Sequence, residues 1–336
     1  MQTPILQFGT SRFLQAHADL FVSEAKDALG GITIVQTTAS GERNKRLAAL
    51  ASPEGFPVHI RGKQGGAVID KVTMVTSVKR AISANADWTE TARIFADEAK
   101  LVICNTADKG YDVSAESETY PEQVPTSFPG KLTKLLYYRF DRNGAPLTIL
   151  PAELITRNGD VLKGIVIELS QRWQLPRSFI DWIQSDIIFS NTLVDRIVSE
   201  ALEPAGAIAE PYALWAIERQ PGQVLPCTHP SIVVADDISP FAQLKLFILN
   251  LGHTFLTDGW LKSDLPRDMT VREILAVPKH RDRLADLDRH DILPGFAKMG
   301  MGGEAEAYIA ATIERFENPF LNHRLSDIAD NHAEKI

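Results

Sequence analysis

Cysteine is scarce in this sequence: its 336 residues include only Cys104 and Cys227. Both thiols lie in apolar stretches and lack the short spacing of a metal-binding motif. This pattern excludes a disulfide framework and indicates buried free thiols in a reducing compartment. A chain of this length buries about 75% of its unfolded surface, so it needs neither a disulfide nor a metal to fold.

The sequence also lacks an excess of positive charge and a long apolar run. Its formal net charge is -8, and its densest basic cluster, residues 42–46, is too short for a nucleic-acid-binding patch. No stretch approaches the roughly 20 apolar residues of a transmembrane helix, and the first residues carry no cationic signal segment. We therefore expect a cytoplasmic protein with no nucleic-acid partner and no membrane partner.

A strand–helix–strand pattern is present at the start of the chain. Residues 4–9 form a short apolar run, residues 11–29 repeat apolar residues at helical spacing, and residues 32–38 are β-branched. Such a unit is typical of a parallel sheet with helical crossovers. Further strands are predicted at residues 56–62, 71–78, 100–106, 146–154 and 231–237. Helices are predicted between them at residues 88–99, 129–140 and 160–173.

The character of the sequence changes near residue 235. The strand patterns stop there, and helical periodicity runs from Phe241 onward. Asp236, Asp237 and Pro240 mark the change. We predict an α/β fold with two domains: a sheet domain at residues 1–235 and a mostly α-helical domain at residues 236–336.

The turn after the first predicted strand has the position of a dinucleotide-binding turn but only part of its motif. A glycine-rich turn there lets the backbone approach a pyrophosphate, which the next helix N-terminus attracts. Gly9 is present, whereas Ser11 stands at the second glycine of G-x-G-x-x-G. No acid follows at positions 36–38 to hold the ribose of NAD. Candidates for a 2′-phosphate contact are Ser40, Arg43, Lys45 and Arg46. An ordinary turn followed by a solvated loop is the alternative, and both NAD and NADP stay open.

Three polar residues interrupt the apolar helical stretch at residues 242–255: Lys245, Asn250 and His253. At about 100° per residue, roughly 80° separates Lys245 from His253, so the three share one broad side of a regular helix. A lysine in apolar surroundings has the lowered pKa that a general acid or base requires. An asparagine amide stabilises an oxyanion, and a histidine orients a hydroxyl. A catalytic site and satisfied core polar residues both fit this pattern.

Several motifs resemble, in chain order, those of the polyol-specific long-chain dehydrogenases, the mannitol dehydrogenase family. KLFILNLGHT, which contains Lys245, Asn250 and His253, resembles the lysine–asparagine–histidine motif of that family. The other matching segments are FGTSRFLQAH, CNTADKGY, LPAELITRNG, SNTLVDRI and RFENPFLNHRL. The resemblance covers almost the whole chain. Glu153-Leu154 stands where the mannitol branch has Asp-Asn, which favours the hexuronate branch.

The resemblance implies a Rossmann-like domain and an NAD-dependent, or NADP-dependent, oxidoreductase. Its substrate would be a small sugar acid or polyol, most closely a keto-hexuronate and its alcohol, as in tagaturonate and altronate. Lys245 would be the general acid and base, Asn250 would hold the reacting oxygen, and His253 would position the substrate. The implied cofactor-binding residues are Gly9, Ser11, Phe13, Asn105, Thr106, Asp108, Val194 and Asp195. The implied substrate-binding residues are Asn158, His323 and Lys335. No metal is needed, because a charged lysine polarises the carbonyl.

Three departures from the family pattern keep other functions open. Ser11 replaces a glycine, Gln15 replaces an arginine, and family members usually continue beyond the segment that ends here. A compact variant and a truncated chain both fit the last departure. The alternatives are a mannitol/fructose or fructuronate/mannonate dehydrogenase, and a catalytically lapsed relative that binds nucleotide or sugar acid. The tendency of the family favours a monomer.

Overall fold

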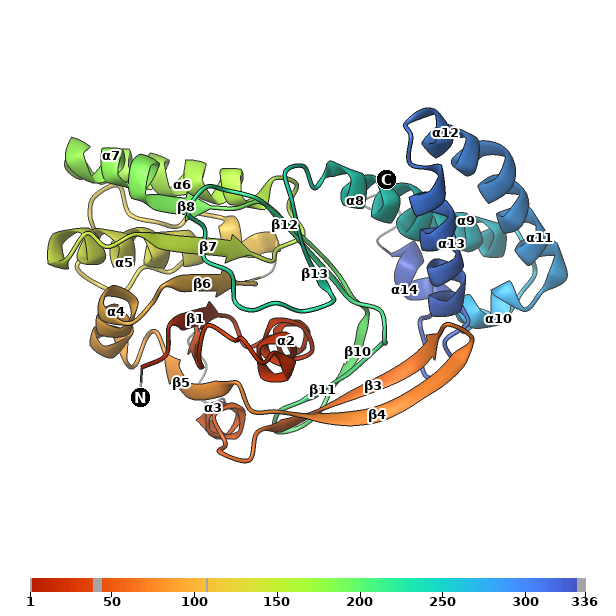
Figure 1. Cartoon of the computed structure of the whole chain (residues 1–336), viewed down its shortest axis with the longest axis horizontal. Coiled ribbons are helices and arrows are strands. Elements are labelled where there is room, and N and C mark those ends of the chain that lie inside the picture. The colour runs from red at the N-terminus through yellow and green to blue at the C-terminus, as the bar shows by residue number, and fades with distance from the viewer. Residues whose placement is uncertain (1, 39–43, 107, 331–336) are drawn as a thin grey trace.

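The computed structural model describes residues 2–38, 44–106 and 108–330. Figure 1 shows a sheet-containing part followed by a helical part. The last strand, β13, ends at Ala235, and the first helix of the helical part, α8, begins at Ser239. The predicted α/β fold with a helical C-terminal domain is confirmed.

A six-stranded, fully parallel sheet forms the centre of the first part, in the order β5-β2-β1-β6-β7-β8. Its strands are β1 (Ile5–Phe8), β2 (Ile32–Gln36), β5 (Val78–Ser83), β6 (Leu101–Cys104), β7 (Leu147–Pro151) and β8 (Ile187–Phe189). The strand order reverses between β1 and β6. Open parallel sheets bind ligands at such a switch point, outside the carboxyl ends of the strands.

Helices cover this sheet with two separate apolar cores. They are α1 (Arg12–Gln15), α2 (Ala18–Glu24), α3 (Asn44–Leu50), α4 (Trp88–Asp97), η2 (Asp108–Tyr111), α5 (Phe128–Arg142), α6 (Asn158–Arg172) and α7 (Arg177–Asp186). The prediction of one helix at residues 11–29 was wrong, because the helix is interrupted between α1 and α2. His17 is fully buried at this break, and its Nε2 lies 3.1 Å from Leu214 O.

Two small sheets accompany the main one, with orders β10-β11-β3-β4 and β13-β12-β9. Their strands are β3 (Phe56–Gln64), β4 (Ala67–Val75), β9 (Thr192–Asp195), β10 (Val198–Ala201), β11 (Ala207–Ala209), β12 (Leu214–Glu218) and β13 (Ile232–Ala235). β3 and β4 form an antiparallel hairpin, so they do not join the main sheet. Gly65 and Gly66 both have positive φ, as a tight two-residue hairpin turn requires.

The helical part has its own apolar core. Its elements are α8 (Ser239–Leu244), η3 (Lys245–Asn250), α9 (Leu251–Leu261), α10 (Val271–Leu275), α11 (Pro278–Leu287), η4 (Asp288–Ile292), α12 (Leu293–Lys298), α13 (Gly302–Phe316) and α14 (Leu325–Ala329). The β3–β4 hairpin extends from the first part to α13 (Figure 1). Within the described residues, no helix has the length and apolarity needed to cross a membrane.

Candidate active site

A cavity of about 430 Å³ lies between the carboxyl edge of the main sheet and the first helices of the helical part. Both domains contribute to its walls. The lining residues are Phe13, Asn105, Ala152, Glu153, Leu154, Val194, Asp195, Arg196, Ile197, Lys245, Leu249, Asn250, His253 and His323. Eight of the predicted site residues are therefore brought together in one cavity: Phe13, Asn105, Val194, Asp195, Lys245, Asn250, His253 and His323.

The turn after β1 is shaped for the close approach of a ligand to the backbone. Gly9 has a φ of +119°, and a Cβ added to it would lie 2.5 Å from Asn105 O. Only glycine fits this conformation and this space. Ser11 caps α1, because its Oγ accepts a hydrogen bond from Leu14 N (3.3 Å) and donates to Asn105 Oδ1 (3.2 Å). The serine that replaces the second glycine thus supports the turn.

Two side chains hold the carbonyl group of Thr10 in this turn. Gln15 Nε2 donates to Thr10 O (3.2 Å), and Gln15 Oε1 accepts from Gly206 N (2.7 Å). Arg46 Nη2 also donates to Thr10 O (3.0 Å). Of the other residues considered for a 2′-phosphate, Lys45 is exposed, whereas Ser40 and Arg43 lie outside the described residues. Gln15 therefore stabilises the turn with a neutral side chain at the position where the family pattern has an arginine.

Asn105 connects the ends of three neighbouring strands. Its backbone N donates to Phe8 O (3.1 Å) at the end of β1, and its Nδ2 donates to Ala152 O (2.7 Å) after β7. Asn105 itself follows β6 directly. Because these strands flank the switch point of the sheet, Asn105 fixes the edge on which a bound dinucleotide would lie.

Glu153 holds the segment that follows β6. Glu153 is 3% exposed, and its carboxylate accepts hydrogen bonds from Thr106 N (3.0 Å), Thr106 Oγ1 (3.2 Å), Tyr111 OH (3.1 Å) and Cys104 Sγ (3.4 Å). Burial raises the pKa of Glu153, and the hydrogen bonds oppose only part of that shift. Thr106 is not a lining residue of the cavity, but it donates hydrogen bonds to Glu153, which is one.

Lys245 begins a π-helical turn, η3, between α8 and α9. The regular 100° spacing assumed from the sequence was wrong here, because i→i+5 bonding underwinds the helix. Such turns occur frequently at functional sites. Lys245 Nζ donates to Val194 O at 2.9 Å. Burial lowers the pKa of Lys245, although the Asp195 carboxylate opposes this shift.

Asp195 forms a buried ionic network beside Lys245. Arg315 Nη1 and Nη2 each lie 2.9 Å from one Asp195 oxygen, and Tyr308 OH donates to Asp195 at 2.6 Å. Burial alone raises the pKa of Asp195, but the Arg315 charge and its hydrogen bonds outweigh this and bring the pKa below its usual value. Arg315 also pairs with Glu210 at 2.8 Å. Asp195 is therefore an ionised neighbour of the lysine.

Two imidazole rings meet at the helical wall of the cavity. His253 is 6% exposed, and its ring centroid lies 4.5 Å from that of Phe316. The His323 ring meets His253 edge-on, with centroids 4.8 Å apart. Both histidines line the cavity next to Asn250. This wall thus offers polar groups to a hydroxylated ligand.

Besides Gly9, Ser11 and Thr106, three further predicted residues are not among those that line the cavity. Asn158 is fully buried: its Nδ2 lies 3.1 Å from each of three backbone carbonyl oxygens, and its Oδ1 accepts from Thr192 N (2.9 Å). A substrate contact by Asn158 is therefore not supported, because the backbone satisfies its amide. Asp108 begins η2, after β6. Lys335 lies outside the described residues.

Sequence reasoning assigned no role to Arg315 and Tyr308, the partners of Asp195. Arg315 stands in the segment RFENPFLNHRL, so a motif signal was present without a role. Tyr308 lies on the same helix, α13, outside every matching segment. Both partners lie more than 110 residues from Asp195 along the chain. Only the three-dimensional structure brings them together.

The Rossmann-type sheet, the helical domain and the buried lysine between them define a two-domain dehydrogenase. Family profiles identify which kind. The profile of the mannitol dehydrogenase Rossmann domain matches residues 3–225, and that of the mannitol dehydrogenase C-terminal domain matches residues 237–336. The chain belongs to the mannitol dehydrogenase family.

Two relatives are about 30% identical in sequence. Altronate oxidoreductase of Halalkalibacterium halodurans is 30% identical, covering 99% of this chain and 68% of its own length. The protein of the same name from Klebsiella pneumoniae is 31% identical, and the match covers 98% of this chain and 72% of that protein.

Two solved structures share the fold at low sequence identity. D-Sorbitol dehydrogenase in substrate-free form has a TM-score of 0.82 at 18% identity, covering 100% of this chain and 74% of its own. The second is Pseudomonas fluorescens mannitol 2-dehydrogenase in a ternary complex with NAD and D-mannitol. It has a TM-score of 0.76 at 19% identity, and the match covers 98% of this chain and 71% of that one.

Proposed function

We propose that this protein is an NAD(P)-dependent oxidoreductase that interconverts a keto-hexuronate and its alcohol, of the tagaturonate/altronate type. The observation that carries the proposal is Lys245, held in the cavity between the two domains beside the ionised Asp195. The altronate oxidoreductases at about 30% identity support the substrate class. Leu154 at the cavity, where the mannitol branch has an asparagine, points the same way.

The turn at Gly9 fits a dinucleotide. Its positive φ, and the Asn105 O atom that would lie 2.5 Å from any Cβ, keep this turn free of a side chain, as the close approach of a pyrophosphate to the backbone requires. Gly9, Ser11 and Phe13 would hold the cofactor on one side, while Asn105 and Val194 would face it from the strand ends. When bound, the nicotinamide supplies or accepts the hydride.

Lys245 moves the proton in this mechanism. Burial lowers its pKa, so Nζ can release a proton to the alkoxide oxygen that forms as a ketone is reduced. In the reverse direction Nζ accepts the proton of the alcohol. Asp195 keeps the cationic form accessible, since its negative charge partly offsets the burial of the ammonium. The Asn250 amide donates to the reacting oxygen, and His253 orients a neighbouring hydroxyl.

Replacing the lysine tests this assignment. We expect Lys245→Ala to lower kcat for ketone reduction about 10²- to 10⁴-fold, the usual contribution of a general acid. NADH affinity, measured by fluorescence, should stay nearly unchanged. Lys262→Ala is the matched control, because Lys262 is exposed and pairs with Asp258 just after α9. Full activity of Lys245→Ala would contradict the proposal.

The pH dependence of the two directions gives a second test of Lys245. Reduction needs the protonated amine and should slow as pH rises through the lowered pKa of Lys245, whereas oxidation needs the free amine and should become faster. Parallel pH profiles in both directions would exclude Lys245 as the proton-transfer group.

A substrate panel decides between the related activities. Oxidation of the reduced nicotinamide should be followed by its absorbance with tagaturonate, fructuronate and fructose, each with NADH and NADPH. We expect the highest kcat/KM with tagaturonate. Turnover of fructose instead would favour the mannitol activity. A thermal shift with cofactor but no turnover of any ketose would indicate a lapsed, ligand-binding relative.

A further inference from the structure

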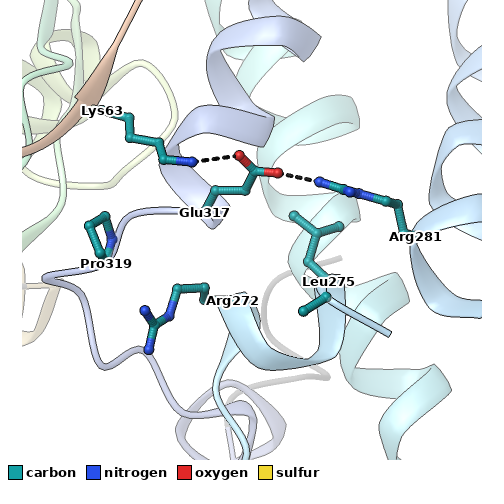
Figure 2. A pocket seen from close by; sticks show the side chains of 7 residues that line it. Lys63, Arg272, Leu275, Arg281, Glu317 and Pro319 are labelled. Carbon is teal, nitrogen blue, oxygen red and sulfur yellow. Dashed lines mark hydrogen bonds and ion pairs between the residues drawn. The ribbon is translucent and has the colours of Figure 1, made fainter. Parts of the chain in front are cut away.

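A second cavity, of about 440 Å³, lies where the β3–β4 hairpin meets the helical domain (Figure 2). It shares no lining residue with the Lys245 cavity. Strand β3 contributes one side, and α10, α11 and the end of α13 contribute the other. The lining residues are Lys63, Arg272, Leu275, Ala276, Arg281, Glu317 and Pro319.

Three cations and one carboxylate line this second cavity. Lys63 Nζ lies 2.9 Å from one Glu317 oxygen, and Arg281 pairs with the other oxygen. Figure 2 shows Glu317 between these two side chains. With Arg272 included, three positive charges face one negative charge, which leaves a surplus of two. In a protein with a net charge of -8, this surplus makes the cavity a local attractor for anions.

Arg272 is the cation that remains available. Its side chain is exposed and makes no hydrogen bond or ion pair with any residue that the structure describes. The carboxylate of its neighbour Glu273 is engaged by Thr270 N and Thr270 Oγ1, both at 2.8 Å. In Figure 2 the Arg272 side chain extends away from Glu317, on the side of Pro319. A guanidinium in a concave site without a partner is suited to bind phosphate or carboxylate oxygens in a bidentate manner.

We propose that the second cavity binds a small polyanion, a metabolite-sized molecule that carries phosphate or several carboxylates. Arg272 makes the principal contact. Lys63 and Arg281 turn toward the anion, and Glu317 is a built-in competitor that occupies them in the free protein. Leu275, Ala276 and Pro319 give the carbon part of the ligand an apolar surface.

Calorimetric titration of the whole protein with inorganic pyrophosphate, and separately with citrate, tests the proposal. Saturating NADH is present throughout, so that pyrophosphate does not titrate the turn at Gly9. We expect saturable binding of at least one anion at one site. Pyrophosphate identifies a phosphate ligand, and citrate identifies a carboxylate ligand.

Two variants of opposite sign make the test specific. Arg272→Gln should weaken binding about fivefold, which corresponds to the loss of one exposed ionic contact. Glu317→Gln should strengthen binding, because it removes the competitor and leaves both of its cations free. Arg289→Gln, on the surface of η4 and outside the lining, is the matched control and should leave binding unchanged.

Three results would overturn the proposal: no saturable binding of either anion, equal weakening by Arg272→Gln and Arg289→Gln, or weaker binding by Glu317→Gln. Circular dichroism of each variant verifies its fold. If Glu317→Gln does not fold, Arg272→Gln still decides, because the Arg272 side chain makes no bond to the described residues that the fold would lose.

Discussion

The two walls of the Lys245 cavity are built differently. The Rossmann wall borders the turn at Gly9, where the main chain carries no side chain, and it contains Asn105, which donates to the carbonyl oxygens of Phe8 and Ala152 at neighbouring strand ends. The opposite wall, where β9 meets η3 and α13 and which we call the helical wall, presents charges, with Lys245 beside Asp195 of β9 and Arg315 of α13. The first wall therefore sets the shape of the site, and the second sets the protonation state of Lys245. Substitutions in the two walls should fail in different ways.

Two buried aspartates show the same contrast. Asp19, on α2, supports the Rossmann wall through Gln7, whose Nε2 lies 3.4 Å from Gly9 O and 3.5 Å from Asp19 Oδ2. Burial raises the pKa of Asp19 to about 8, and the bond from Gln7 offsets only part of this. Asp195 on the other wall has a lowered pKa because Arg315 outweighs its burial. Asp19 behind the Rossmann wall therefore stays protonated at neutral pH, whereas Asp195 on the other wall is ionised.

The largest effect on stability should come from Arg315. Arg315→Met leaves Asp195 and Glu210 buried without their cation, which costs about 3–5 kcal/mol of unfolding free energy. The matched control, Arg177→Met, removes an exposed pair with Asp181 and should cost less than about 1 kcal/mol. Urea unfolding measures both. Equal losses would mean that the helical wall does not depend on its buried charges.

The two aspartates should separate in the pH dependence of stability. The pKa of Asp19 rises from 3.8 to about 8 on folding, so the folded state keeps a proton that the unfolded chain has lost. Stability then falls by up to about 1.4 kcal/mol per pH unit between these values as pH rises. Asp19→Asn should flatten this slope, as urea unfolding at several pH values would reveal.

Asp195→Asn is the counterpart with the opposite sign. Because the folded pKa of Asp195 is lowered, its contribution is present above the unfolded pKa and is lost as pH falls through the folded value. The variant should lose this acid-side dependence and keep the slope that Asp19 causes. If Asp19→Asn keeps the wild-type dependence of stability on pH, Asp19 is not the buried group that stays protonated in the folded protein.

Gly9→Ala tests the shape of the Rossmann wall. The φ of +119° and the 2.5 Å approach to Asn105 O strain any side chain there, by about 1–3 kcal/mol. We expect NADH to bind about tenfold more weakly, as fluorescence titration would show. Gly164→Ala on α6 is the control, since its Cβ meets open space and alanine should stabilise the helix by about 0.5–1 kcal/mol. Similar NADH affinities for both variants would contradict a backbone-built site.

The smallest effect should come from Ser11→Gly. Glycine also caps helices, so the loss in stability should be only a few tenths of a kcal/mol. NADH affinity should change by less than about twofold, or 0.4 kcal/mol. A much larger loss of affinity would show that the Ser11 hydroxyl itself binds the cofactor, and that the Rossmann wall is not built from main chain alone.

Local patterns allowed much of the Rossmann wall to be predicted. The run that ends in Gly9 and the β-branched residues of β2 lie close in sequence, so short-range periodicity reports them. Lys245, Asn250 and His253 were found for a related reason: polar residues are conspicuous in an apolar helix. Their placement on a π-helical turn was not predicted, because an i→i+5 register leaves no clear mark in side-chain periodicity.

Interactions across long sequence separations were not predicted. Nothing near Asp195 indicates that Arg315 is its partner, because this pair depends on the packing of α13 against β9. Asn158 looked like a site residue because it is polar and lies in a family segment. Its buried bonds to backbone carbonyl oxygens appear only once β7 and β9 are placed side by side. Residue type alone does not tell a ligand contact from a backbone clamp.

The β3–β4 hairpin gives the helical domain a second attachment to the first part. The backbone N atoms of Gly65 and Gly66 donate to Glu314 on α13, and Asn318 Nδ2 donates to Arg61 O (3.1 Å). These bonds brace the helical domain at a second point, away from the chain crossing that leads to α8. A body held at two separated points resists rotation as a hinge. Substrate should therefore enter and leave through an entrance that stays open, without closure of the two domains.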